Sequence, residues 1–426
     1  MNPLKCYKPY KQDDFEYGIF INRLAPGKNS VTVNFASEDQ DFTIIVRKNK
    51  KIFQKVTTQE KSVTINHLPE QSELTVQIIS KKNKSAIRKF HTGDFLHDVI
   101  NYVDKEETQY AHSGNFLGSP FIIRFQGKLW VTMDIFKNGG TKDNGHTATM
   151  LFVSEDEGKS WQFVCDFVPS QWGRLFVVNN ELYFYGSNLF DNSIDLIKSN
   201  DGFNWGESVT IVEEGRTSPT QILVDDKYIV FAFRGVVGDN ESHVKVASGN
   251  IRSGLMHPAS WRISNEIVPD FAWGGDQTMR YAEEGNIVEY NNQIYVFLRF
   301  AYQTALVLHY DLQSNELRFE KTIDMECGWC KFYIEKYQGY YYAMGNTTCF
   351  PRQVMKLYRS CDLEKWDEVK IIDDITHLDK DLNGVQYPSF FIEKDKLYLV
   401  LRIALNGAET FHNSNATVFD ILNVKI

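Results

Sequence analysis

The sequence lacks any segment that would place the chain in a membrane or on a nucleic acid. None of its apolar runs is long enough to cross a bilayer, and the first ten residues, MNPLKCYKPY, have neither an apolar core nor an export cleavage site. Its net charge is −9, and no long run of Lys or Arg appears outside residues 47–51. We therefore expect no membrane and no nucleic-acid partner. These features favour a cytoplasmic protein, or a secreted one if a leader has been trimmed.

The sequence also lacks the motifs of several kinds of catalysis. It has no phosphate-binding glycine loop, no H-E-x-x-H and no nucleophile elbow, so no cofactor and no metal are expected. The six cysteines do not form the disulfide pattern of a small domain. Cys327 and Cys330 form a C-x-x-C, but redox chemistry of the thioredoxin type needs a following helix, and zinc needs a second ligand pair. We interpret this pair as packing or pocket lining.

The chain contains a succession of short segments with the residue pattern of β-strands. Its composition, 42% hydrophobic and 14% aromatic, is sufficient to fill a large core. Alternating apolar residues between 17 and 92 predict an N-terminal β-sandwich of immunoglobulin or fibronectin type over residues 1–95. Residues 96–110 are predicted as a linker, with a helix near 96–107. From residue 111 to 426, a hairpin pattern recurs roughly every fifty residues, which predicts a six-bladed β-propeller. The predicted fold class is all-β.

One turn motif is repeated. Residues 154–161 read S-x-D-x-G-x-S-W, and shorter versions occupy 199–205 and 360–366. Asp156 can accept hydrogen bonds from the amides of its own turn, Gly158 can adopt a positive φ, and the tryptophan can fill the sheet beneath. Three copies indicate a repeated β unit.

This motif resembles the Asp-box of sialidases and related β-propellers, and the resemblance covers residues 112–426. It implies a glycosidase site at the centre of the propeller, assembled from one or two residues per blade. Asp143, in the segment GGTKDNGH at 139–146, falls where the family has its acid/base aspartate. An Asp-Asn-Gly sequence is also an ordinary polar turn.

The same resemblance assigns four further residues. The segment from Glu284 to Arg299 is similar to the one that runs from the family's general base to an arginine of its carboxylate-binding triad, and the two ends of a hairpin can share one pocket. Arg352 precedes the last box as the family's final arginine does. Tyr387 corresponds to the nucleophile, and a neutral nucleophile avoids repelling an acidic sugar. Packing or surface positions are the alternative for each.

The chain departs from the family at the first arginine of the triad. The family's Arg-Ile-Pro is replaced by Gly118-Ser119-Pro120, and Arg124 lies too deep in its predicted strand to substitute. Loss of one guanidinium should weaken carboxylate recognition by about 1.5–3 kcal/mol. True sialidase activity is therefore an open question at this point.

A second resemblance is to bacterial sialidase-like propellers, some of which act on rhamnose–glucuronate linkages. The shared sequence segments are Ser119-Pro120, Glu284-Gly-Asn and, near the C-terminus, Arg402-Ile-Ala with His412. This resemblance makes histidines candidates for acid/base work, because imidazole titrates near neutrality. The histidines concerned are His112, His146 and His412.

Three further residues lie near predicted blade openings, where sugar faces could stack on aromatic rings. They are Trp172, Trp273 and Trp329, and Arg174 lies two residues after Trp172. Buried packing is the alternative for each tryptophan.

The leading hypothesis is an exo-acting glycoside hydrolase that releases a terminal sugar, expected to be acidic, from an oligosaccharide or glycoconjugate. One alternative is a rhamnose- or glucuronate-directed glycosidase or a polysaccharide lyase on the same propeller. The other is a non-catalytic glycan-binding propeller, since fold does not settle function.

Overall fold

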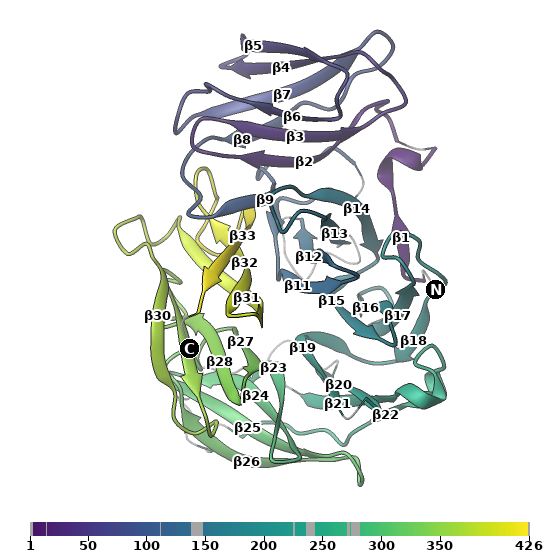
Figure 1. Cartoon of the computed structure of the whole chain (residues 1–426), viewed down its shortest axis with the longest axis vertical. Coiled ribbons are helices and arrows are strands. Elements are labelled where there is room, and N and C mark those ends of the chain that lie inside the picture. Colours follow the sequence, from purple (N-terminus) through teal and green to yellow (C-terminus); the bar gives the residue numbers. More distant parts are fainter. Residues whose placement is uncertain are drawn as a thin grey trace.

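The computed structural model describes residues 3–13, 15–110, 112–137, 148–224, 226–235, 243–270, 273 and 282–424. The predicted site residues Asp143 and His146 lie outside these ranges. The described chain consists of β-strands and of short 3₁₀ turns at Pro9–Lys11, Ile251–Ser253 and Pro258–Ser260 (Figure 1). Within these ranges no helix has the length and apolarity needed to cross a membrane.

The N-terminal unit contains two antiparallel sheets that share one core. Side chains in strand β3 alternate between buried and half-buried, as expected for a sheet with one face covered. The rings of Phe35 and Phe42, one from each sheet, pack edge to face with centroids 4.7 Å apart. The sheets are β2 (Phe20–Pro26), β3 (Val31–Ala36) and β6 (Ser62–Ile65), and β5 (Lys51–Thr58), β4 (Phe42–Lys48), β7 (Glu73–Ser80) and β8 (Arg88–His91).

The rest of the described chain forms six antiparallel sheets arranged in a ring. Their first strands contact one another in the order β11, β15, β19, β23, β27 and β31, and β31 contacts β11 again (Figure 1). The first three sheets are β11 (Phe121–Phe125), β12 (Lys128–Phe136), β13 (Ala148–Ser154), β14 (Gln162–Val168); β15 (Gln171–Val178), β16 (Glu181–Asn188), β17 (Ser193–Ser199), β18 (Val209–Val212); and β19 (Arg216–Val224), β20 (Tyr228–Arg234), β21 (Val244–Asn250), β22 (Trp261–Ile263).

The other three sheets complete the ring in the same way. They are β23 (Glu283–Tyr290), β24 (Gln293–Ala301), β25 (Thr304–Asp311), β26 (Glu316–Asp324); β27 (Phe332–Tyr337), β28 (Tyr340–Asn346), β29 (Val354–Ser360), β30 (Asp367–Asp374); and β31 (Gly384–Glu393), β32 (Lys396–Ala404), β33 (Ala416–Asn423), β9 (Asp98–Tyr102). Two short strands, β1 (Lys5–Tyr7) and β10 (Phe116–Leu117), extend the first sheet.

The predicted helix near 96–107 is wrong, because this stretch contains strand β9. It pairs antiparallel with β33, with Tyr102 opposite Ala416, and supplies the fourth strand of the last sheet. Its β-branched residues Val99 and Ile100 are buried, which suits a strand covered on both faces. The ring is thus closed by a strand that comes from before its first sheet.

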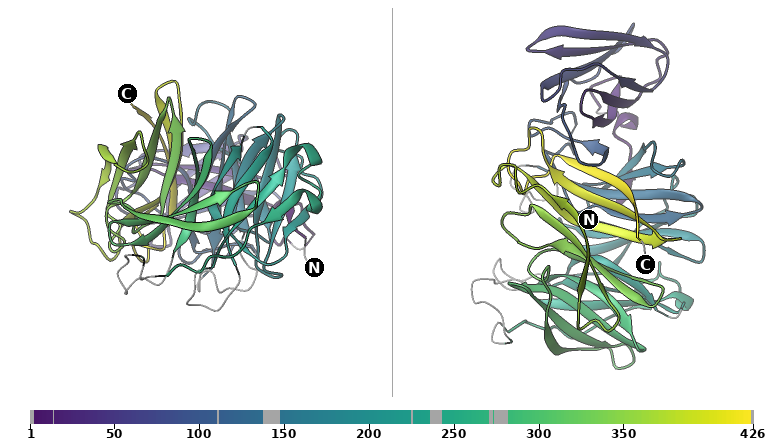
Figure 2. Two further views of the ribbon diagram at one scale, coloured as in Figure 1. Left: turned by 90° about the horizontal axis from the view of Figure 1, so that it is seen from below. Right: turned by 60° about the vertical axis from the view of Figure 1, so that its left-hand side comes forward.

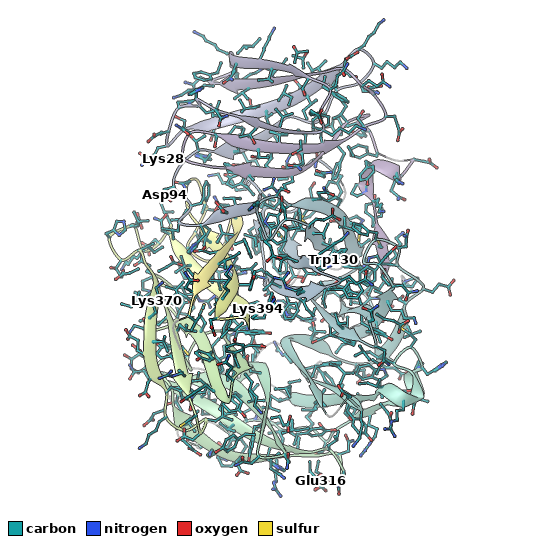
Figure 3. All side chains as sticks on the ribbon, viewed as in Figure 1. Lys28, Asp94, Trp130, Glu316, Lys370 and Lys394 are labelled. Carbon is teal, nitrogen blue, oxygen red and sulfur yellow. The ribbon has the colours of Figure 1, made fainter. Side chains whose placement is uncertain are left out.

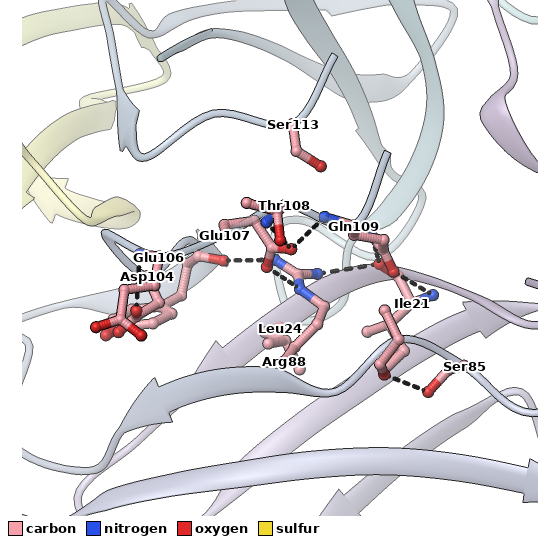
Figure 4. Close-up of polar contacts among 12 residues, drawn as sticks. Ile21, Leu24, Ser85, Arg88, Asp104, Glu106, Glu107, Thr108, Gln109 and Ser113 are labelled. Carbon is pink, nitrogen blue, oxygen red and sulfur yellow. Dashed lines mark hydrogen bonds and ion pairs between the residues drawn. The ribbon is translucent and has the colours of Figure 1, made fainter. Parts of the chain in front are cut away.

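The N-terminal unit and the ring are stacked along the long axis of the molecule (Figure 2). A buried ion pair joins the two parts (Figure 4). Nε of Arg88, on β8, lies 2.5 Å from Oε2 of Glu107, and both side chains are 5% exposed. The same guanidinium donates to the carbonyls of Ile21 and Tyr102 at 3.0 and 3.3 Å. Because every contact is buried, the two parts are held in a defined orientation.

Most large apolar side chains lie inside the sheets, and most charged side chains lie at the surface. Trp130 is fully buried within the first sheet, whereas Lys28, Glu316 and Lys370 project at the periphery (Figure 3).

The repeated turns form the hydrogen bonds that the sequence predicts. Ser154 Oγ donates to Asp156 Oδ1 at 2.8 Å, Ser160 N donates to the same oxygen at 2.8 Å, and Gly158 has φ +86°. Trp161 is buried against Phe419 of the last sheet, with centroids 5.3 Å apart. Each turn joins the third and fourth strands of a sheet, so the turns stabilise the outer part of the ring and lie away from its first strands.

Candidate functional site

Four of the six first strands carry a bulge near their beginning. The register of β15, β19, β23 and β31 with the next strand shifts within the first few residues. The shifts lie between Gln171 and Arg174, Thr217 and Gln221, Glu283 and Asn286, and Gln386 and Ser389. Trp172, Glu284 and Tyr387 lie in three of these bulges and have φ of 53°, 59° and 55°. Such values are uncommon outside glycine and indicate a locally constrained backbone that re-aims the side chain. Three predicted site residues therefore occupy equivalent positions in their sheets.

Glu284 and Arg299 form an ion pair between neighbouring strands. Glu284 Oε2 lies 3.2 Å from Arg299 Nε, and both side chains are nearly buried. Arg299 Nη2 also lies 3.3 Å from Oε2 of Glu283, whose other oxygen accepts from Arg234 Nη1 at 2.7 Å. Burial alone would raise the pKa of Glu284, but Arg299, Lys331 and a hydrogen bond from Tyr387 together lower it. Glu284 is consequently a charged proton acceptor at neutral pH.

Tyr387 lies between this carboxylate and two arginines. Its side chain interacts with Glu284, and each of the two groups shifts the pKa of the other. The guanidinium carbons of Arg402 and Arg352 lie 4.0 and 5.4 Å from the centre of its ring. Burial and the neighbouring Glu284 charge raise the pKa of Tyr387, although the arginines oppose them. The phenol is therefore neutral at rest and has a carboxylate in place to accept its proton.

Gln386 holds the two arginines together. Its Oε1 accepts from Arg352 Nη1 at 2.7 Å and from Arg402 Nη2 at 3.2 Å, while its Nε2 donates to the Phe411 carbonyl at 2.7 Å. Arg402 Nη1 reaches across to the Leu117 carbonyl at 3.5 Å, beside the Gly-Ser-Pro that replaces the first arginine of the resemblance. A guanidinium from the last sheet thus lies next to the segment in which the sequence has no arginine.

His412 lies beside this cluster and is exposed to solvent. Its Nε2 is 3.5 Å from Arg402 Nη2. Desolvation, together with the charges of Arg402 and Arg352, lowers the pKa of His412. The arginine charges therefore favour the neutral imidazole over the charged one.

Sequence reasoning missed Lys331, which precedes β27. Its side chain is 3% exposed, donates to the Phe332 carbonyl at 2.6 Å, and lies 5.3 Å from the ring centre of Tyr333. Burial lowers the pKa of Lys331 to about 7, while the charge of Glu284 opposes that effect. A lysine between apolar residues was the available signal, since lysine is rarely buried without a function or a partner.

A pocket opens beside Glu284. Its wall includes Ser119, Trp172, Arg234, Glu283 and Glu284. Trp172 is half-buried there and offers an aromatic face next to the carboxylate.

Arg174 lies close to this pocket but is fully buried. Its Nη1 donates to the carbonyls of Ser119 and Gly173 at 3.1 and 2.8 Å, and its guanidinium packs on Phe121. It thus supports the wall at Ser119.

The remaining predicted residues do not join the cluster. The ring of His112 packs against Tyr7 of β1, at the outer edge of the first sheet, with centroids 5.0 Å apart. Trp273 stacks on Phe319 of β26, the outermost strand of its sheet, at 4.2 Å. Arg124 forms ion pairs with glutamates at the periphery.

Cys327 and Cys330 are buried, as packing residues would be.

Comparison with known proteins supports the fold. No family model and no curated protein sequence matches this chain. Among solved structures, the Hadza microbial sialidase Hz136 matches 100% of this chain and 99% of its own length at 10% identity, with a TM-score of 0.54.

Trypanosoma rangeli sialidase, in complex with 2,3-difluorosialic acid as a covalent intermediate, matches 72% of this chain at 12% identity, with a TM-score of 0.53. The matched region is 54% of that protein, so this chain spans about half the length of the trypanosomal sialidase. This chain has a sialidase-like fold.

Proposed function

We propose that this protein is an exo-acting glycoside hydrolase that releases a terminal acidic sugar from an oligosaccharide. In this proposal the ring of six sheets is a six-bladed β-propeller, and the N-terminal unit is an immunoglobulin-like sandwich. The observation that carries the proposal is the Tyr387–Glu284 pair, set among buried arginines in the middle of the ring.

The arginines suit a carboxylate ligand. Arg352 and Arg402 are buried against the ring of Tyr387, and Arg299, from a third element, is half-buried and paired with Glu284. Guanidinium groups bind carboxylates by charge and through paired hydrogen bonds, and burial strengthens both effects. Arg402 compensates for the missing first arginine, which supports an acidic substrate.

The pair of Tyr387 and Glu284 suits a double-displacement reaction. As the tyrosine oxygen attacks the anomeric carbon, Glu284 takes the phenolic proton, and a carbon–oxygen bond to Tyr387 forms while the glycosidic bond breaks. Asp143 is the proposed donor of a proton to the departing oxygen. Water then attacks the glycosyl–tyrosine, Asp143 takes the proton from that water, and Tyr387 recovers its proton from Glu284.

A rhamnose- or uronate-directed enzyme on the same scaffold is the second candidate. The contact of Arg402 with His412 favours it, because both residues belong to the second resemblance and could hold a uronate carboxylate. Because the pKa of His412 is lowered, we assign it a role as a neutral group. In that role it positions the sugar by donating or accepting a hydrogen bond.

A substrate panel tests the proposal. Sialosides, glucuronides and rhamnosyl-glucuronates are incubated with wild type, Glu284→Gln and the same-strand control Glu289→Gln, and the products are separated by chromatography. We expect release of one terminal acidic sugar by wild type and by the control, and a loss of at least about 100-fold for Glu284→Gln. A product that absorbs in the ultraviolet would identify a lyase. Binding without release would make the protein a glycan-binding propeller and contradict the proposal.

A further inference from the structure

A cysteine outside the proposed chemistry lies in contact with Arg352. The carbonyl of Cys349 accepts a hydrogen bond from Arg352 Nε at 3.2 Å, and its sulfur lies 3.8 Å from Arg352 Nη2. A guanidinium at this distance favours the thiolate over the thiol. Cys349 therefore contacts one of the two arginines beside the Tyr387 ring through both its backbone and its side chain.

Cys349 has a second thiol as its neighbour. The side chains of Cys330 and Cys349 are hydrogen-bonded to each other, and both cysteines are free and buried. The hydrogen bond from Cys330 lowers the pKa of Cys349 to about 6 against the effect of burial, with help from Arg352 and Arg299, whereas burial raises the pKa of Cys330. One sulfur is thus a thiolate and the other a thiol at neutral pH.

The other cysteines provide an internal comparison. Cys6 and Cys165 also form a hydrogen-bonded pair, but Lys8 is the cation that lowers the pKa of Cys6. Cys361 is exposed. Cys327 lies against Gly345 in the packing of the fifth sheet. The close contact with an arginine therefore distinguishes Cys349.

We propose that Cys349 and Cys330 form a peroxide-sensitive dithiol, in which Cys349 is oxidised first and Cys330 converts it to a disulfide. This inference does not depend on which sugar the pocket accepts. Hydrogen peroxide is the proposed oxidant, because it is a small molecule that reacts with thiolates.

The chemistry proceeds in two balanced steps. The Cys349 thiolate attacks one peroxide oxygen, so a sulfur–oxygen bond forms, the oxygen–oxygen bond breaks, and hydroxide leaves and takes up a proton. The sulfur is oxidised by two electrons to sulfenic acid, and peroxide is reduced to water. Cys330 then loses its proton and attacks the Cys349 sulfur, which forms the disulfide and releases a second water. Oxidation removes the negative charge beside Arg352.

Peptide mapping of the full chain tests this assignment. Reduced protein is treated with hydrogen peroxide, the remaining thiols are alkylated, and the digest is examined by mass spectrometry. We expect a peptide linked between Cys330 and Cys349, and fragmentation between Cys327 and Cys330 shows which thiol takes part. In Cys330→Ser, we expect dimedone to trap a sulfenic acid on Cys349.

The rates provide a second measurement that needs no variant. The rate at which iodoacetamide alkylates Cys349 should follow the thiolate fraction of that cysteine and reach half of its maximum near pH 6. An alkylation rate of Cys349 that still rises about tenfold between pH 7 and 8, a disulfide between Cys327 and Cys330, or peroxide treatment that leaves Cys349 reduced would each overturn the proposal.

Discussion

His97 connects three parts of the chain at the point where the ring closes. It precedes β9, and its Nδ1 and Nε2 lie 3.0 Å from carboxylate oxygens of Asp420 on β33 and Asp373 on β30. Burial alone would lower the pKa of His97, but the two carboxylates outweigh it and raise the pKa to about 9. The protonated imidazole therefore stabilises the contact between the last two sheets and the strand that completes the ring.

The sign and size of this effect follow from linkage. Between pH 6.5 and 9 the folded state holds a proton that the unfolded state has lost, so the contribution is complete below pH 6.5 and disappears as the pH rises through 9. At about 1.4 kcal/mol per pH unit, the contribution is about 3 kcal/mol. We expect His97→Asn to lower the free energy of unfolding by about that amount at pH 6, and by much less at pH 9.5.

Urea unfolding at half-unit intervals from pH 6 to 9.5 measures this difference. The matched control is His377→Asn, since His377 is exposed, and it should change the free energy of unfolding by less than about 0.5 kcal/mol at every pH. A difference between wild type and His97→Asn that stays constant with pH, or grows as the pH rises, would refute the charged bridge.

Three further substitutions test other parts of the structure. Glu107→Gln leaves the buried guanidinium of Arg88 without its counter-charge and should lower the free energy of unfolding by about 3 kcal/mol, as measured in urea. Lys331→Met removes an amine whose pKa falls to about 7 on folding. Between pH 7 and 10.5 the unfolded wild type therefore binds more protons than the folded wild type, so its free energy of unfolding should rise with pH. Urea unfolding of Lys331→Met should lack this rise. Arg402→Lys should reduce kcat/KM for the acidic substrate by about 10- to 100-fold, and much less for its carboxamide analogue, if the guanidinium binds the carboxylate.

Local chemistry made part of this structure predictable from sequence. The turn at Ser154 and Asp156 forms through side chains within a few residues of each other, so its hydrogen bonds could be predicted without knowledge of the fold. The proximity of Glu284 and Arg299 could also be predicted from the sequence, because both residues belong to one hairpin.

Long-range contacts account for what could not be predicted. Strand β9 was predicted as a helix because its partner, β33, lies more than three hundred residues further along the chain. The position of Arg402 depends on the closure of the ring, which brings it to the Leu117 carbonyl. Lys331 and Gln386 likewise acquire their importance from side chains contributed by other strands.

The most direct test of the proposed site is to trap the sugar on Tyr387. Wild type, Tyr387→Phe and Glu284→Gln are incubated with a fluorinated analogue of the acidic sugar that the substrate panel selects, carrying a good leaving group, and intact and digested protein are measured by mass spectrometry. The account predicts that wild type gains the mass of one sugar on the peptide that contains Tyr387, while Tyr387→Phe gains none. Attachment to a different residue, or turnover by Tyr387→Phe at the wild-type rate, would contradict it.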